Sequence, residues 1–212
     1  MIRIVDYGSG NLRSVQKAVQ SLGVDAVISN RPEEFSPDDR LILPGQGAFA
    51  DCAKGLEDSG LKELVLEHIA ADRPLLGICV GLQLLFDVGR EDGEHAGLGV
   101  LRGEVVRFAG PAFEGPNREK ITLMGWCPLL PPAGKGLDDT PAFRGLPANP
   151  HVYFVHSYHA AGVDPAVVAA EAEHGGRFVA AVHRGALTAT QFHPEKSQAV
   201  GLQILRNFSE AH

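Results

Sequence analysis

The sequence predicts an α/β fold with three layers, in which helices flank a mixed, mostly parallel sheet. In the first half of the chain, short runs rich in Ile, Leu and Val alternate with longer amphipathic segments, the pattern of βαβ units around a parallel sheet. After Gly97 the pattern changes to short strands separated by turns, which favours antiparallel or mixed pairing. The 212 residues are an ordinary length for one domain, so we expect a single domain over residues 1–212.

In the first half, each apolar run is expected to form a strand and each amphipathic run a helix. Asn11 can cap a helix whose apolar residues recur at helical spacing, and Gly23 stands where this helix is expected to end. A second helical stretch is expected to break at Gly55 and Gly60. The predicted strands are residues 2–5, 24–28, 41–43 and 75–78, and the predicted helices are residues 11–22 and 49–70.

In the second half, strands predominate and one helix closes the chain. The run 131–136 holds two prolines and two glycines, so we predict a loop there. The predicted strands are residues 98–108, 121–123, 152–155, 167–173, 178–183 and 186–191, and the predicted helix is 197–210.

Composition and charge weigh against several classes of protein. The 19 Lys and Arg residues against 26 Asp and Glu give a formal net charge of −7, and no segment concentrates basic residues, so binding to nucleic acid is not indicated. The cysteines, Cys52, Cys79 and Cys127, lack Cys-x-x-Cys spacing, so neither a disulfide framework nor a thiolate zinc site is indicated. No apolar run has the length of a membrane span or the form of a secretory signal. We therefore expect a cytoplasmic protein with no metal site and no cofactor.

The strongest candidate for a catalytic group is Cys79, which ends a predicted strand and opens a helical segment. Gly77 and Gly81 lie two residues to either side of it, and such glycines let the backbone turn sharply and a substrate approach, as in a nucleophile elbow. A helix N-terminus also favours the thiolate, which is the reactive form of cysteine. The alternative is a buried structural cysteine, and the flanking glycines weigh against it.

A thiolate that attacks an acyl group needs a base and a group that orients the base. His193 follows an apolar strand, and Glu195 stands two residues further on, where its side chain can point to the same side. A carboxylate bound to one ring nitrogen leaves the other nitrogen facing the thiol. The alternative is a histidine with a purely structural role in a turn. The presence of both a nearby glutamate and a predicted cysteine nucleophile favours the catalytic interpretation.

A third element is the glycine-rich turn that holds Gly45 and Gly47. Their backbone amides, free of obstruction by side chains, can donate to a developing oxyanion, although a Gly-x-Gly turn taken alone is more often a plain tight turn. Gly8-Ser9-Gly10 is a weaker candidate for phosphate binding, because Arg13 stands where the dinucleotide-binding pattern requires glycine.

Six blocks of the sequence together form a recognisable set. They are DYGSGNL at 6–12, LPGQGAF at 43–49, GICVGLQLLF at 77–86, MGW at 124–126, YFVHSY at 153–158 and QFHPEKS at 191–197. With these blocks, which span nearly the full length, the chain resembles the class I glutamine amidotransferases. Within that family it is similar to the glutaminase subunits of imidazole glycerol phosphate synthase, from histidine biosynthesis. The cysteine and His-Pro-Glu blocks are typical of the superfamily, and the first, fourth and fifth blocks favour this subunit.

The resemblance implies a Cys-His-Glu triad that hydrolyses L-glutamine to glutamate and ammonia. Cys79 corresponds to the nucleophile, His193 to the acid and base, and Glu195 to its orienting group. The implied partner is a separate (βα)₈-barrel cyclase subunit, which forms a heterodimer with the chain and uses the ammonia to make imidazole glycerol phosphate. The implied substrate-binding residues are Gln83, Gly45, Gly47, Glu91 and Ser157, and the implied interface residues are Asn11, Trp126, Tyr153 and Lys196.

Two positions depart from the family's usual pattern, and other functions stay open. Gln46 stands where valine is usual, and Cys127 stands where asparagine is usual. The nearest alternative is the glutaminase subunit of another synthase, of the anthranilate or guanylate type, which shares the cysteine and His-Pro-Glu blocks. A non-catalytic binding subunit of the same fold, or an unrelated thiol hydrolase acting on peptides, is disfavoured by the intact triad and by Gln83.

Overall fold

The centre of the molecule is a twisted sheet. The computed structural model describes residues 1–210, and within them seven strands form this sheet. They are β1 (Ile2–Val5), β2 (Ala26–Ser29), β3 (Arg40–Gly45), β4 (Leu75–Cys79), β11 (Val168–Glu173), β12 (Arg177–Arg184) and β13 (Leu187–Thr190). Their order is β11-β12-β13-β4-β3-β1-β2. The pairs from β13 through β2 are parallel, whereas β12 pairs antiparallel with both β13 and β11. The prediction of a mixed, mostly parallel sheet is therefore confirmed.

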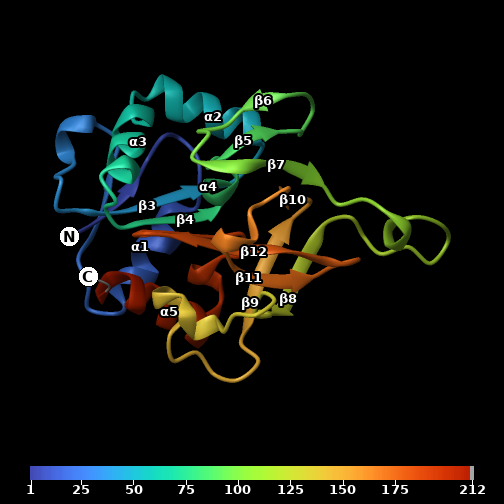
Figure 1. Ribbon diagram of the computed structural model, residues 1–212. Helices are drawn as coiled ribbons and strands as arrows, with labels where there is room; N and C mark the ends of the chain where they lie inside the picture. Colours follow the sequence, from blue (N-terminus) through green and yellow to red (C-terminus); the bar gives the residue numbers. More distant parts are fainter. Residues whose placement is uncertain (211–212) are drawn as a thin grey trace.

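Helices cover both faces of this sheet, which gives the three predicted layers (Figure 1). Two helices lie on one face, α2 (Phe49–Asp58) and α3 (Lys62–Ala70), and two on the other, α1 (Leu12–Gln20) and α5 (Gln198–Glu210). Each turns apolar residues towards the sheet, as Val15 and Val19 of α1 illustrate. The short helix α4 (Val80–Gln83) follows β4 directly. None of the helices in the described part of the chain is long and apolar enough to cross a membrane.

Two smaller sheets extend from the central one. A four-stranded sheet has the order β10-β7-β5-β6, made of β5 (Phe86–Gly89), β6 (His95–Ala96), β7 (Leu101–Arg107) and β10 (Tyr158–Ala161). A two-stranded antiparallel ribbon joins β8 (Leu123–Pro128) to β9 (His151–His156). Short 3₁₀ turns fill the connections, at Pro32–Glu34, Pro111–Phe113, Leu137–Asp139, Pro141–Phe143, Pro165–Val167 and Pro194–Lys196, the last labelled η6.

The buried side chains form two clusters. The larger one packs the parallel strands against α1, α2, α3 and α5, with Ile4, Ile42 and Leu76 fully buried. The second lies beneath the antiparallel half and is rich in aromatic residues, among them Phe154 and Phe192, whose rings meet edge to face 5.8 Å apart. Cys79 belongs to the larger cluster, and Phe192, the neighbour of His193, belongs to the second.

Several predicted boundaries need correction. The expected break at Gly55 is wrong, because α2 continues through it; the missing side chain makes room for the Tyr7 carbonyl oxygen, which a Cβ would approach to 2.7 Å. The break at Gly60, with φ 71°, is confirmed. Asn11 does precede α1, but its backbone, at φ −86° and ψ 62°, lies outside the extended geometry of a capping residue, and its side chain makes no cap hydrogen bond.

Other differences are shifts of boundary or short strands that were not predicted. The helix expected at 11–22 ends at Gln20. The strand expected at 121–123 begins only at Leu123, as β8, and the one expected at 98–108 begins at Leu101. The strands β5, β6 and β10 were not predicted, because each is only two to four residues long and lacks a clear alternation of apolar and polar residues. The predicted loop at 131–136 and the C-terminal helix are confirmed, although the helix begins one residue later, at Gln198.

Candidate active site

Cys79 lies at a sharp turn between a strand and a helix, as its flanking glycines predict. It is the last residue of β4, and its backbone has φ 56° and ψ −110°, a conformation that is strained for any residue with a side chain. Both flanking glycines are required: a Cβ on Gly81 would collide with the Leu43 carbonyl oxygen, and one on Gly77 would lie 2.8 Å from the Ala189 Cβ. The geometry is that of a nucleophile elbow.

His193 and Glu195 form a buried pair beside this turn. His193 comes three residues after β13, which pairs with β4, and Glu195 lies in η6. The Nδ1 of His193 lies 2.8 Å from Oε1 of Glu195, and their side chains are only 4% and 1% exposed. Burial opposes the charged imidazolium, but the Cys79 sulfur and the Glu195 carboxylate outweigh it and raise the pKa of His193 to about 9. The other ring nitrogen, Nε2, is buried without a hydrogen-bond partner among residues 1–210.

A cavity of about 170 Å³ joins these groups to most of the predicted substrate-binding residues. Gln83, Glu91, Ser157 and Gly47 line it, together with Cys79 and His193. Gly45 does not line it. Instead, Gly45 packs against the turn at Cys79, where an added Cβ would lie 2.8 Å from the Gly81 nitrogen. The remaining lining residues are Gln46, Val80, Val155, His156 and Tyr158.

Hydrogen bonds hold Gln83 and Glu91 in place at the cavity. The Nε2 of Gln83 donates to the Tyr158 carbonyl oxygen and to Oε1 of Gln191, each at 3.1 Å. Oε2 of Glu91 accepts the backbone N–H of Phe49 at 2.7 Å, at the first residue of α2. Glu91 therefore ties the cavity wall to the helix that follows the glycine-rich turn.

The glycine-rich turn is clamped by Ser9, which belongs to the Gly8-Ser9-Gly10 segment. The Ser9 hydroxyl donates to the Gln46 carbonyl oxygen at 2.6 Å and accepts the Gln46 backbone N–H at 3.2 Å. The sulfur of Cys52 lies 3.2 Å from the same hydroxyl. Burial raises the pKa of the Cys52 thiol, and burial likewise raises that of Cys127, which favours the neutral thiol at both of these positions.

Two further residues of the site were not assigned roles from the sequence. Gln191 is fully buried, and its Nε2 lies 3.8 Å from the Cys79 sulfur. His156 lines the cavity; its Nδ1 lies 2.9 Å from the Tyr158 carbonyl oxygen, and burial lowers its pKa to about 3. Both residues lie inside recognised blocks of sequence, but nothing in their spacing indicates which way their side chains point.

Similarity to known proteins identifies the family of this site. The chain matches the family model described as glutamine amidotransferase class-I over residues 3–211. The chain is a class-I glutamine amidotransferase. The amidotransferase is 48% identical over 212 residues to the imidazole glycerol phosphate synthase subunit HisH of Syntrophotalea carbinolica, a match that covers 99% of this chain and 100% of that protein. It is also 48% identical to the HisH subunit of Rhodopirellula baltica, covering 100% of this chain and 98% of that one.

Solved structures agree on the fold. The amidotransferase aligns with a crystal structure titled glutamine amidotransferase at a TM-score of 0.70 and 21% identity, covering 99% and 100% of the two chains. It aligns with a protein from Thermoplasma acidophilum described as a GMP synthase subunit at a TM-score of 0.66 and 24% identity, covering 98% of this chain and 90% of that one. The predicted family and fold class are therefore confirmed, and the amidotransferase is a glutamine-hydrolysing enzyme.

The four residues implied to contact a partner lie outside the cavity. Trp126 and Tyr153 face each other across the β8-β9 ribbon, with ring centroids 6.0 Å apart, and Trp126 is 45% exposed. Lys196 lies in η6 directly after Glu195, and Asn11 precedes α1. The backbone of Tyr153 contacts the segment that holds His193 and Glu195, because its carbonyl oxygen accepts the His193 N–H at 3.0 Å.

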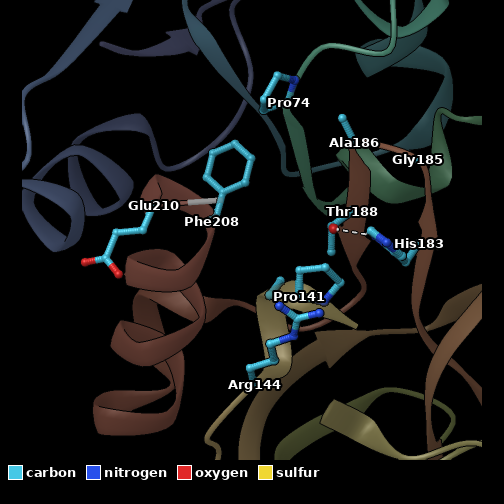
Figure 2. Close-up of a pocket in the computed structure, with 10 residues that line it drawn as sticks. Pro74, Pro141, Arg144, His183, Gly185, Ala186, Thr188, Phe208 and Glu210 are labelled. Atoms are coloured by element: carbon cyan, nitrogen blue, oxygen red, sulfur yellow. Dashed lines mark hydrogen bonds between the residues drawn. The ribbon is translucent and has the colours of Figure 1, made fainter. Parts of the chain in front are cut away.

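A second and larger cavity, of about 460 Å³, lies by the amino-terminal ends of β4 and β13 (Figure 2). Pro74, Phe208 and Arg144 line it, and His183 and Thr188 form a hydrogen bond of 3.0 Å across one wall. None of the predicted catalytic or substrate-binding residues borders this cavity. Among residues 1–210, no group of three or more His, Cys, Asp or Glu side chains is arranged to hold a metal ion.

Proposed function

We propose that the amidotransferase is the glutaminase subunit of imidazole glycerol phosphate synthase, and that it hydrolyses L-glutamine through Cys79, His193 and Glu195. The observation that carries the catalytic part is the strained Cys79 turn beside the buried His193–Glu195 pair in one small cavity. The choice of synthase is supported by relatives at 48% identity over the full chain, which bear the name of that subunit.

The groups of the cavity suit the cleavage of an amide by a thiol. The thiol proton passes to Nε2 of His193, whose raised pKa favours the imidazolium, and the sulfur attacks the carbon of the side-chain amide of glutamine. The backbone amides of Gly47 and Val80, both at the cavity, are suited to stabilise the oxyanion. His193 then gives its proton to the departing ammonia, and a water molecule, activated by the same nitrogen, hydrolyses the thioester to glutamate.

The remaining lining residues suit the amino-acid end of the substrate. Glu91 supplies a carboxylate for the α-ammonium group, and the backbone at Ser157 supplies polar groups for the α-carboxylate. The hydroxyl of Ser157 is paired with that of Thr122 at 2.7 Å, so we assign recognition to the backbone of Ser157 rather than to its side chain. A volume of about 170 Å³ fits a single amino acid rather than a peptide.

The ammonia is proposed to pass to a (βα)₈-barrel cyclase subunit in a heterodimer. Free ammonia in neutral water is mostly protonated and no longer nucleophilic, so delivery along a protected path benefits the synthase. The partner would cover the exposed side of the β8-β9 ribbon, where Met124 and Trp126 are 67% and 45% exposed. The three free cysteines fit a reducing compartment, and we place the reaction in the cytoplasm.

A reconstituted synthase tests this proposal. The chain is mixed with a candidate cyclase and its nucleotide substrate, and the release of glutamate and of imidazole glycerol phosphate is followed. Cys79→Ala should abolish both products with glutamine as the nitrogen source, yet leave synthesis from ammonium salts at high pH intact. The matched control is Cys127→Ser, which removes a partly exposed thiol outside the cavity and should leave glutamate release unchanged. Glutamine-dependent turnover by Cys79→Ala would contradict the proposed mechanism, and failure with every cyclase would contradict the proposed partner.

A further inference from the structure

We infer that Gln191 sets the reactivity of the Cys79 thiol, as the last member of a hydrogen-bond relay that begins at the Tyr158 carbonyl and passes through Gln83. This inference rests on the proposed glutaminase function, because it concerns the nucleophile of that reaction. Gln191 is fully buried and carries no charge. Its side chain spans the space between Gln83 and the Cys79 sulfur.

The sheet places Gln191 beside the nucleophile. The strands β13 and β4 pair in parallel, with Thr190 opposite Ile78, so the next residues along each strand are Gln191 and Cys79. The backbone N–H of Gln191 donates to the Ala180 carbonyl oxygen at 2.8 Å, which fixes the position of its Cα. The side chain therefore reaches the sulfur from a rigid element of the fold.

The direction of every bond in the relay follows from its first acceptor. A backbone carbonyl oxygen only accepts, so the amide group of Gln83 must turn its nitrogen towards Tyr158. The second hydrogen of that nitrogen meets the side chain of Gln191, which must therefore present its oxygen. This leaves the nitrogen of Gln191 facing the Cys79 sulfur, where it can only donate.

The relay has a consequence at each end. At Cys79, an N–H directed at the sulfur, 3.8 Å from nitrogen to sulfur, stabilises the thiolate over the neutral thiol, which needs no donor. At Gln83, both amide hydrogens are used, and Oε1 has no hydrogen-bond partner among residues 1–210. Gln83 therefore offers the cavity an acceptor, which suits the ammonium group of an amino acid and not its carboxylate.

The experiment compares the pH dependence of thiol alkylation in the parent chain and in Gln191→Met, which keeps the length of the side chain but lacks the donor. Iodoacetamide is the probe, and the extent of reaction is read from the mass of the peptide that contains Cys79, so that Cys52 and Cys127 do not contribute. We expect the midpoint of alkylation to rise by ~0.5 to 1 pH unit, the size of effect that one hydrogen bond of average strength produces. The KM for glutamine should rise as well, because Gln83 loses the partner that fixes its amide.

The matched control is Thr188→Val, a nearly isosteric change on the same strand that removes the buried hydroxyl bonded to His183 (Figure 2). Both variants are expected to lower the melting temperature, but the control should keep the parent's alkylation midpoint. An unchanged midpoint in Gln191→Met would overturn the inference and leave Gln191 a structural residue. Should Gln191→Met not fold, Gln191→Leu is measured against the same two expectations. Alkylation needs no glutamine, so a parent chain that fails to hydrolyse glutamine contradicts the proposed function alone.

Discussion

The Nδ1 of His193 lies 2.8 Å from Oε1 of Glu195, in a pair that is shielded from solvent and separated by a single proline. A carboxylate oxygen can only accept, so this contact places the proton on Nδ1 and leaves Nε2 as the nitrogen that exchanges a proton with the thiol. Glu195 thus fixes both the tautomer and the orientation of the base.

Replacing Glu195 by Gln should slow turnover while leaving the binding of glutamine nearly unchanged. The neutral amide removes one of the two charges that raise the pKa of His193, so this pKa should fall below the value of about 9 in the parent. We expect kcat to fall by ~10- to 100-fold, less than the loss in His193→Ala, because an orienting group contributes less than a group that reacts. Steady-state kinetics and an NMR titration of the imidazole check the two parts. A kcat equal to the parent's would refute the role of Glu195.

The His193–Glu195 pair should make the free energy of unfolding depend on pH. The pKa of His193 is raised in the fold, to about 9 from an ordinary value of 6.5, so the folded protein binds this proton more tightly than the unfolded chain. The stabilisation is fully present below pH 6.5 and is lost as the pH rises through about 9. Chemical denaturation at pH 7 and pH 9.5 should show a smaller loss of stability in Glu195→Gln than in the parent. Equal losses in the two proteins would show that the carboxylate does not raise this pKa.

Gly81→Ala should destabilise the whole protein because the turn at Cys79 has no room for a methyl group. A Cβ at this position would collide with the Leu43 carbonyl oxygen, which belongs to the central strand β3 and cannot move aside. We expect a loss of ~3 kcal/mol or more in the free energy of unfolding, or failure to fold. The control is Gly136→Ala in the loop after β8, where the nearest atom would lie 3.8 Å away, and it should stay within ~0.5 kcal/mol of the parent. Equal stability of the two variants would show that the turn can relax.

The sharp turn at Cys79 and the contact of His193 with Glu195 were predictable from sequence, because these residues occupy positions with strong local rules. A cysteine between two glycines at a strand end, and a histidine with a glutamate two residues away, each restrict the backbone enough to indicate a geometry. The main strands were predictable because β3 and β4 hold continuous apolar runs and β1 is apolar except at Arg3. The sequence also predicted that the Gly45–Gly47 turn lies near the nucleophile.

The features that could not be predicted depend on contacts between distant segments. The clamp of Ser9 on Gln46 joins residues 37 positions apart, and the contact of Gln191 with Cys79 joins residues 112 positions apart. Gly55 looked like a helix break, whereas its role is to let the Tyr7 carbonyl approach α2. Each of these depends on which side chain faces which neighbour, and hydrophobic periodicity carries no information about that.

Trp126→Ala and Lys196→Ala should weaken stimulation by the partner more than they weaken basal hydrolysis. Trp126 packs on Tyr153, whose carbonyl oxygen accepts the His193 N–H. A partner that displaces this exposed ring would therefore move the segment with His193 and Glu195 through two contacts. We expect the isolated chain to be a poor glutaminase, and partner plus nucleotide to raise its rate by at least ~10-fold, a coupling of ~1.4 kcal/mol. The ratio of stimulated to basal kcat is the measurement. Ratios equal to the parent's in both variants would remove these residues from the interface.

Ser9→Ala should raise the glutaminase rate of the isolated chain. The Ser9 hydroxyl donates to the Gln46 carbonyl oxygen at 2.6 Å, so it fixes the orientation of the peptide group whose N–H belongs to Gly47, the amide proposed for the oxyanion. Ser9 lies two residues before Asn11, which is expected at the partner interface, so a partner that moves this loop would release the peptide group. Without the hydroxyl the peptide group is released without a partner, and the basal rate should rise by ~3- to 10-fold while the stimulation by the partner shrinks by the same factor. The control is Ser21→Ala, which removes an exposed hydroxyl that also donates to a backbone carbonyl, at 2.7 Å, and should change neither rate. A basal rate that falls in Ser9→Ala would mean the opposite, that the clamp keeps the turn in its active form.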